Sequence, residues 1–225
     1  MADTRAIWQP KLKQALSLYV LTDRLLSRGL SEQDVVRHAI AGGATAIQLR
    51  WKEGPLREAV AIARDLKAIC AERDVLFIVN DRLDLAMTVG ADGCHLGEDD
   101  IPVAAARQLV GDSMILGYSP ADLAEVPMAV ESGADYLGVG PVYGSNTKDD
   151  AGEAVGIERM RAVRDLTELP FVGIGGINAE NAVPVIEAGA DGVAVISSVV
   201  AQDDIEAAAR SLRDQVDAAL ARKQR

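Results

Sequence analysis

The sequence predicts a single domain folded as a (β/α)8 TIM barrel. Short apolar runs alternate with helical patterns, a glycine element recurs where helices give way to strands, and polar residues gather at the strand ends. The 225 residues suit one such domain, with 1–17 as an N-terminal lead-in, 18–199 as the barrel and 200–225 as a closing C-terminal helix. A doubly wound sheet is the rival fold, but eight units without an obvious switch point favour closure.

The predicted strands are short, mostly rich in β-branched residues, and bounded by Gly, Pro or Asp. They span Leu18–Asp23, Thr45–Lys52, Leu76–Asn80, Gly93–Gly97, Met114–Ser119, Tyr136–Val142, Phe171–Ile177 and Gly192–Val199. Helical patterns separate these runs, and the clearest are Ser31–Ala41, Leu56–Glu72, Pro102–Val110 and Glu158–Thr167. Ser31 is expected to cap the first of these helices, with Asp34 in its first turn.

Both ends of the chain carry further helical patterns. Asp203–Ala221 holds an apolar stripe that predicts an amphipathic closing helix. The stripe consists of Ile205, Ala209, Leu212, Val216 and Leu220. In the lead-in, a helix over Pro10–Ser17 would cover the bottom of the barrel.

A three-residue element recurs where a helix ends and a strand begins. Its copies are Gly43-Ala44-Thr45, Gly90-Ala91-Asp92, Gly133-Ala134-Asp135 and Gly189-Ala190-Asp191. Glycine in this place fits a left-handed helix C-cap, because it has no side chain to clash. The repeat therefore indicates structure rather than chemistry.

Composition favours a cytoplasmic enzyme that acts on small molecules. The chain has 34 acidic and 23 basic residues, a formal net charge of −11, and no basic block that would track nucleic acid. No apolar run reaches the ~18–20 residues of a membrane span, and Met1–Pro10 does not resemble a signal peptide. Cys70 and Cys94 give no disulfide framework. The sequence is compatible with a homo-oligomer but does not fix the oligomeric state.

Polar residues at the ends of the second, third and fourth predicted strands suggest a site for an anion and a metal. Gln48, Arg50 and Lys52 alternate along one strand and should share the face that points into the barrel mouth. Buried cations are costly unless an anion binds them, so an anion site is favoured over the alternative of solvated rim charges. Asp81 and Asp100 follow the next two strands, and Mg²⁺ typically takes one or two carboxylates plus substrate phosphates.

The later strand ends suggest a second anion site. Gly175-Gly176 and Ser197-Ser198 lie at the ends of the seventh and eighth predicted strands, where barrels of this class usually bind phosphate. Gly144–Lys148 adds hydroxyl groups and a lysine after the sixth strand, although such residues are also common in turns. Two anion sites in one barrel mouth predict a transferase that joins two phosphorylated molecules.

The two histidines offer no hydrolase triad and no zinc spacing. His38 lies on a predicted helix and is expected at the surface. His95 lies within the fourth strand, where a hydrogen-bonded core or mouth histidine is the favoured interpretation over a catalytic one.

In this order, the strand-end motifs resemble the thiamine-phosphate synthase family from Leu18 to Val199. The matching segments are Leu18–Asp23, Gln48–Lys52, Asn80–Ala86, His95–Asp100, Gly140–Tyr143 with Thr147-Lys148, and Gly175–Ile177. The resemblance implies a TIM-barrel transferase that uses Mg²⁺. Such an enzyme joins 4-amino-2-methyl-5-hydroxymethylpyrimidine diphosphate to hydroxyethylthiazole phosphate, and it releases thiamine phosphate and diphosphate.

The resemblance also implies roles for single residues. The segment Gln48-Leu49-Arg50-Trp51-Lys52 and Asn80 would bind the pyrimidine diphosphate, and Asp81 with Asp100 would hold Mg²⁺. Ser119 and Lys148 would contact the diphosphate and, with Arg50 and Lys52, form the catalytic set. The thiazole phosphate would meet Ser145, Asn146, Thr147, Gly176, Ile196 and Ser197.

Two other functions fit part of the pattern. A thiazole-phosphate tautomerase of the same fold would bind a monophosphate but would not need Asp81, Asp100, Arg50 and Lys148 together. A non-catalytic phosphate-binding barrel would need binding groups alone. The joint presence of the four charged residues favours the synthase.

Overall fold

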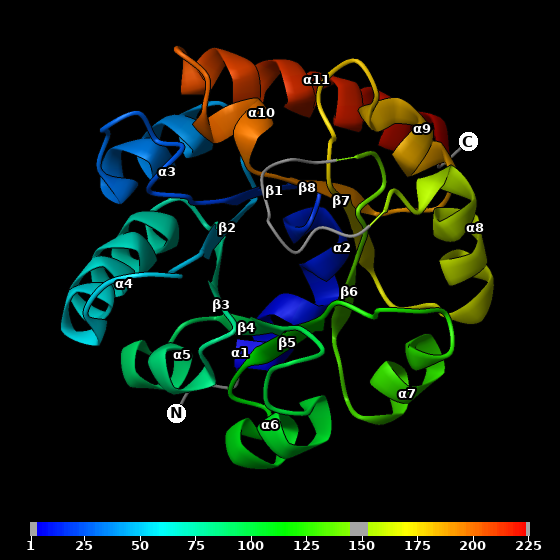
Figure 1. The fold of residues 1–225 in the computed structure, drawn as a ribbon, viewed down its shortest axis with the longest axis horizontal. Helices are drawn as coiled ribbons and strands as arrows, with labels where there is room; N and C mark the ends of the chain where they lie inside the picture. The colour runs from blue at the N-terminus through cyan, green and yellow to red at the C-terminus, as the bar shows by residue number, and fades with distance from the viewer. Residues whose placement is uncertain (1–3, 145–152, 224–225) are drawn as a thin grey trace.

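The computed structural model describes residues 4–144 and 153–223, and within them parallel strands close into a barrel in chain order (Figure 1). Strand β1 pairs with both β2 and β8, which confirms closure over the doubly wound alternative. The strands are β1 Leu18–Leu21, β2 Ala46–Leu49, β3 Leu76–Asn80, β4 Gly93–Leu96, β5 Ile115–Tyr118, β6 Tyr136–Val139, β7 Phe171–Ile174 and β8 Gly192–Val195.

Helices form the outer ring around the strands (Figure 1). They are α3 Glu32–Ala41, α4 Leu56–Ala71, α5 Leu83–Val89, α6 Val103–Val110, α7 Glu125–Glu131, α8 Gly156–Leu166, α9 Ala182–Glu187, α10 Ser197–Val200 and α11 Ile205–Lys223. The expected cap of α3 is confirmed, since the Ser31 hydroxyl accepts a hydrogen bond from the Asp34 amide at 3.1 Å. Among the described residues, no helix combines the length and apolar character needed to cross a membrane.

Side chains on each strand alternate between two apolar clusters. On β2, Ala46 belongs to the cluster inside the barrel, whereas Ile47 and Leu49 belong to the cluster between strands and helices. The alternation places the side chains of Gln48 and Arg50 on the inner side, as the sequence predicts. The outer cluster is much the larger and also buries the apolar stripe of α11.

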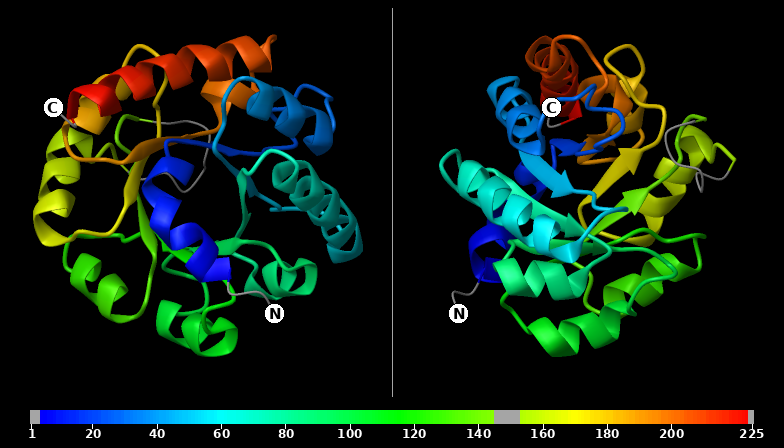
Figure 2. Two further views of the ribbon diagram at one scale, coloured as in Figure 1. Left: turned by 180° about the vertical axis from the view of Figure 1, so that it is seen from behind. Right: turned by 60° about the vertical axis from the view of Figure 1, so that its left-hand side comes forward.

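The lead-in fills the lower end of the barrel. It consists of α1 Thr4–Trp8, the 3-10 helix η1 Gln9–Lys11 and α2 Leu12–Ala15, which lie across the opening (Figure 2). Trp8, Leu12 and Leu16 are buried in the interior cluster. A side chain at Gly192 would collide with the Leu16 carbonyl, so this close approach requires glycine. The expected helix at the barrel bottom is therefore present, and it begins earlier than Pro10.

Several strands are shorter than predicted, and β8 shows why. The prediction carried this strand to Val199, but β8 ends at Val195 and residues Ser197–Val200 form α10. Val199 and Val200 are fully buried, so the apolar run continues through a change of secondary structure. Periodicity cannot separate a buried strand from a short buried helix.

The recurrent glycine element closes the bottom of the barrel in the same way four times. Each glycine has a positive φ, at 103°, 62°, 89° and 117° for Gly43, Gly90, Gly133 and Gly189. The third residue then accepts a hydrogen bond from a backbone amide of the preceding strand. The pairs are Thr45 with Leu18, Asp92 with Phe77, Asp135 with Leu116 and Asp191 with Phe171. The element therefore ends a helix and ties neighbouring strands together.

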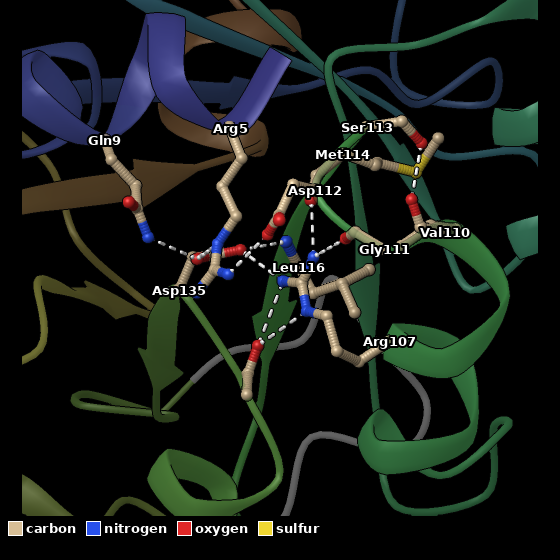
Figure 3. Close-up of polar contacts among 11 residues, drawn as sticks. Arg5, Gln9, Arg107, Val110, Gly111, Asp112, Ser113, Met114, Leu116 and Asp135 are labelled. Atoms are coloured by element: carbon tan, nitrogen blue, oxygen red, sulfur yellow. Dashed lines mark hydrogen bonds and ion pairs between the residues drawn. The ribbon is translucent and has the colours of Figure 1, made fainter. Parts of the chain in front are cut away.

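Asp135 carries the densest of these connections (Figure 3). Its side chain is fully buried and accepts from Arg107 at 2.5 Å, Arg5 at 2.8 Å, Gln9 at 3.1 Å and the Leu116 amide at 2.8 Å. The carboxylate thus joins the lead-in to α6 and to β5. A buried charge with this many partners is costly to leave incomplete.

Asp135→Ala should lower the free energy of unfolding by about 3–5 kcal/mol, because it leaves the buried Arg107 guanidinium without its carboxylate counter-charge and the Leu116 amide without its acceptor. Urea unfolding followed by circular dichroism measures the change. Asp112→Ala is the matched control, since Asp112 also pairs with Arg5 but is 68% exposed. The control should change stability by less than about 0.5 kcal/mol. Equal losses in the two variants would contradict the role given to Asp135.

Candidate active site

The upper end of the barrel collects the charged groups that follow β1, β2, β3 and β4. Arg50 lies just beyond β2, and its guanidinium contacts the Asp23 carboxylate at 2.7 Å. Both side chains are largely buried, with 15% and 8% exposed. The Arg50 Nε is buried and has no partner among the described residues. Arg50 is therefore a cation held in place by Asp23, and its hydrogen-bonding capacity is not fully used.

Sequence reasoning missed the partner of Arg50. It placed Asp23 at the end of the first strand without giving it a role. Asp23 also accepts hydrogen bonds from the Leu25 and Leu26 amides at 3.0 and 3.2 Å, which orient its carboxylate. The first strand end thus neutralises the cation that the second strand end presents.

Lys52, Asp81 and Asp100 form a second charged group beside the first. The Lys52 Nζ lies 2.8 Å from an Asp81 oxygen. Burial raises the pKa of Asp100, and the charge of the neighbouring Asp81 carboxylate raises it further, against the opposing effects of the Gly97 amide and Lys52. Two carboxylates held this close favour a bound cation, because a cation relieves their repulsion.

The backbone holds Asp81 in an unusual conformation. Its φ is 62°, in the left-handed region that non-glycine residues rarely adopt. The Asp81 amide donates to the His95 carbonyl at 2.8 Å, which ties this turn to β4. Strain of this kind clusters at functional sites and persists where surrounding contacts enforce it.

The acidic run after β4 separates into distinct roles. Glu98 and Asp99 are exposed, whereas Asp100 turns inward and accepts from the Gly97 amide at 2.7 Å. Among the described residues, no three His, Cys, Asp or Glu side chains form a metal-binding group. Asp81 and Asp100 can therefore supply only part of a coordination shell. A partial shell fits Mg²⁺, which commonly keeps waters and substrate phosphates as its other ligands.

A cavity of about 970 Å³ occupies the opposite side of the mouth. Among its lining residues are Ser119, Gly175, Gly176, Ile196, Ser197 and Ser198. Gly175 and Gly176 have φ values of 97° and 67°, and a side chain on either would lie within 3 Å of residues 141–144. The loop backbone is thus exposed to the cavity beside the start of α10. This arrangement suits a phosphate group, which backbone amides can bind.

A chain of hydrogen bonds crosses the barrel interior between these two sides. The Gln48 amide donates to the Tyr19 hydroxyl at 2.5 Å, which lies 2.9 Å from the Tyr136 hydroxyl. Tyr136 contacts the His95 Nδ1 at 3.0 Å, and the His95 Nε2 contacts the Ser119 hydroxyl at 2.8 Å. The prediction of a hydrogen-bonded mouth histidine agrees with this geometry. Tyr19 and Tyr136 were not recognised in the sequence, because their role depends on barrel closure.

The remaining predicted site residues fall into three groups. Asn80 ends β3 and is 9% exposed at the mouth. Leu49 is fully buried in the outer apolar cluster, and Trp51 packs partly against that cluster, with Arg24 4.8 Å from its ring. These two side chains therefore lie away from the barrel interior. The predicted contacts Ser145, Asn146, Thr147 and Lys148 lie outside the described residues.

Fold and site together define a phosphate-handling enzyme on a (β/α)8 barrel. The family described as thiamine monophosphate synthase matches residues 18–199. The chain belongs to this family, and it is a transferase.

Individual relatives agree with this assignment. The chain is 50% identical to a thiamine-phosphate synthase of Chloroflexus aurantiacus, over 87% of this chain and 90% of that protein. It is also 50% identical to one of Moorella thermoacetica, over 88% and 95%. The solved structure of thiamine phosphate pyrophosphorylase from Pyrococcus furiosus superposes with a TM-score of 0.86 and 41% identity, covering 93% of this chain and all of that one. A 3-hexulose-6-phosphate synthase, at 17% identity and a TM-score of 0.65, shares the fold alone.

Asp81→Asn should lower the pKa of Asp100, because removing the neighbouring negative charge makes ionisation of Asp100 easier. The pH dependence of the Asp100 carboxyl ¹³C signal measures this value. Part of the elevation should remain, since burial is its largest cause. Glu98→Gln is the control and should leave the Asp100 titration in place, because Glu98 is exposed. An unchanged or higher pKa in Asp81→Asn would contradict the close pairing.

Proposed function

We propose that the chain condenses 4-amino-2-methyl-5-hydroxymethylpyrimidine diphosphate with hydroxyethylthiazole phosphate in the presence of Mg²⁺. The products would be thiamine phosphate and diphosphate. The observation that carries the proposal is the division of the mouth into two sides. One side has Arg50, Lys52 and the carboxylate pair of Asp81 and Asp100, and the other has the glycine and serine cavity. A tautomerase would need only the second side.

The proposed roles follow from charge and position. Arg50 and Lys52 now pair with Asp23 and Asp81. In the complex, the two cations would bind the diphosphate oxygens, either in place of these carboxylates or in addition to them. Mg²⁺, held by Asp81 and Asp100, would neutralise the charge that develops on the leaving diphosphate. Ser119 would donate to the diphosphate from just beyond β5, and Lys148, which lies outside the described residues, would complete this set.

The thiazole half would bind on the side of the cavity. Its phosphate would lie against Gly176, Ile196 and Ser197, where the backbone is open to the ligand. The thiazole nitrogen would then face the hydroxymethyl carbon of the pyrimidine. Ser145, Asn146 and Thr147 are proposed as further contacts of this substrate.

Bond formation would follow a dissociative path. The carbon–oxygen bond to diphosphate breaks first, and the amino-substituted pyrimidine delocalises the positive charge left on its methylene carbon. The thiazole nitrogen then attacks that carbon, and no proton has to be removed from the nucleophile. The protein therefore needs to position two substrates and stabilise the leaving group, and this path assigns no step to a general base.

One assay distinguishes the proposed function from its alternatives. The purified protein is mixed with both phosphorylated substrates and Mg²⁺, and thiamine phosphate and diphosphate are measured over time. Formation of both products in equal amounts supports the synthase. Isomerisation of a thiazole precursor without the pyrimidine substrate would indicate a tautomerase, and binding without turnover would indicate a sensor barrel.

Asp81→Ala should raise the Mg²⁺ concentration needed for half-maximal rate by at least about tenfold, because it removes one of the two proposed metal-binding carboxylates. The KM for the pyrimidine diphosphate should rise with it, since metal and diphosphate would bind together. Steady-state rates over a Mg²⁺ titration measure both effects. Glu98→Ala is the control, because Glu98 lies in the acidic run that contains Asp100 but is exposed to solvent, and it should show the parent dependence. Unchanged Mg²⁺ dependence in Asp81→Ala would refute the metal assignment.

A further inference from the structure

The hydrogen-bond chain from Gln48 to Ser119 links side chains of four strands, and of the residue just after β5, into one path. Its members come from β2, β1, β6, β4 and the end of β5 in turn: Gln48, Tyr19, Tyr136, His95 and Ser119. The two tyrosines are 1% and 0% exposed, so their hydroxyls must find partners inside the protein. Burial also raises the pKa of both hydroxyls, which keeps their protons in place.

Two glycines make room for this path. A side chain at Gly117 on β5 would collide with the Tyr136 ring and with the His95 imidazole. A side chain at Gly138 on β6 would crowd His95 and the Ser119 hydroxyl, at 3.0 and 3.1 Å. Glycine inside a strand weakens it and calls for a reason. Here the reason is the space that the polar path occupies.

The hydrogen bonds of the path all run in one direction from donor to acceptor, because each buried hydroxyl has one proton to donate. The Gln48 amide donates to Tyr19. With its lone pair taken by that amide, Tyr19 has its own proton for Tyr136, and Tyr136 in turn has its proton for the His95 Nδ1. In this direction Nδ1 accepts, so the ring proton that faces the Ser119 hydroxyl is the one on Nε2. The Ser119 proton is left to point onward. Turning the Gln48 amide over would reverse every step.

The two ends offer complementary groups to a ligand. The Gln48 Oε1 is buried and has no hydrogen-bond partner among the described residues, so this end presents an acceptor. Ser119 lines the cavity, and this end presents a donor when the path runs in the sense described. A ligand that donates to Gln48 and accepts from Ser119 therefore fixes the direction of the hydrogen bonds at both ends of the path.

We propose that this path is a polarised relay in which Tyr19, Tyr136 and His95 are positioning residues that set the Ser119 hydroxyl as a donor. Its ligand class is a molecule with an amino donor at one end and an anionic leaving group at the other. This inference rests on the proposed function, whose pyrimidine diphosphate has both groups. Gln48 recognition and Ser119 donation are thereby coupled through the barrel interior.

The direct test is the tautomer of His95, measured by ¹⁵N NMR on the full-length protein. The chain has only two histidines, and His38 is exposed on α3, so His38→Gln assigns the spectrum. Free protein should show His95 protonated on Nε2. Gln48→Met removes the first donor at similar size, and the Nε2–H population should fall. Adding magnesium diphosphate should restore the Nε2–H population, because an anion that accepts from Ser119 sets the same direction of hydrogen bonding from the Ser119 end. An unchanged His95 signal in Gln48→Met would overturn the relay.

Tyr136→Phe interrupts the path while keeping the ring that packs in the interior. In this background, Gln48→Met should no longer change the His95 tautomer. Turnover should fall by about tenfold in kcat/KM, the size of one hydrogen bond to a charged ligand. The loss should not add to that of Ser119→Ala, because Tyr136 acts through Ser119. Tyr118→Phe is the matched control, since its hydroxyl contacts Glu125 at 2.9 Å outside this path, and its kcat/KM should stay within about twofold of the parent value.

The readouts separate the relay from the proposed function. If the assay shows no thiamine phosphate but Gln48→Met still changes His95, the synthase proposal fails and the relay stands. If turnover is normal, the relay is overturned when Tyr136→Phe keeps the parent kcat/KM, or when its loss adds fully to that of Ser119→Ala. Thermal unfolding of each variant identifies any loss that comes from an unfolded barrel.

Discussion

Closure of the parallel strands is the constraint on which the rest of the structure depends. It sends every second side chain of each strand into one interior that has to be filled and whose polar atoms have to be paired. The interior changes character along its axis. Trp8, Leu12 and Leu16 fill the lower end, the path through Tyr19 and Tyr136 crosses the middle, and Arg50 reaches the upper end. Each level fills the interior and pairs its polar atoms with a different kind of side chain.

The sequence predicts those parts of the structure that depend on neighbours along the chain. The glycine elements were recognised because a left-handed cap and a strand start lie within three residues, as at Gly133. The predicted end of the eighth strand was wrong because Val199 and Val200 stay buried after the backbone changes from strand to helix. The contact of Tyr19 with Tyr136 joins residues 117 positions apart and depends on strand register. The partner of Arg50 was missed for the same reason, since Asp23 follows β1 whereas Arg50 follows β2.

Aspartates at the two ends of the barrel differ in how completely they are paired. Asp135 at the bottom receives Arg107, Arg5, Gln9 and a backbone amide, so its charge is fully used in holding elements together. Asp81 at the mouth has Lys52, a left-handed backbone and a second carboxylate beside it. Complete pairing stabilises a fold, whereas incomplete pairing leaves a group ready to bind something else. The same residue type therefore serves stability at one end and, in the proposed complex, chemistry at the other.

A net charge of −11 opposes the approach of substrates that carry phosphates. Positive charge at the barrel mouth offsets this repulsion locally, because Asp23 and Asp81 hold Arg50 and Lys52 in positions that a diphosphate could reach in the proposed complex. Those carboxylates keep the cations ordered, so less side-chain entropy is lost when an anion binds. In the proposed complex, a divalent cation on Asp81 and Asp100 reverses the sign of the potential at the same spot. The acidic residues of the mouth then assist the binding of an anion, and long-range repulsion by the remaining surface is weakened by salt beyond about 8 Å.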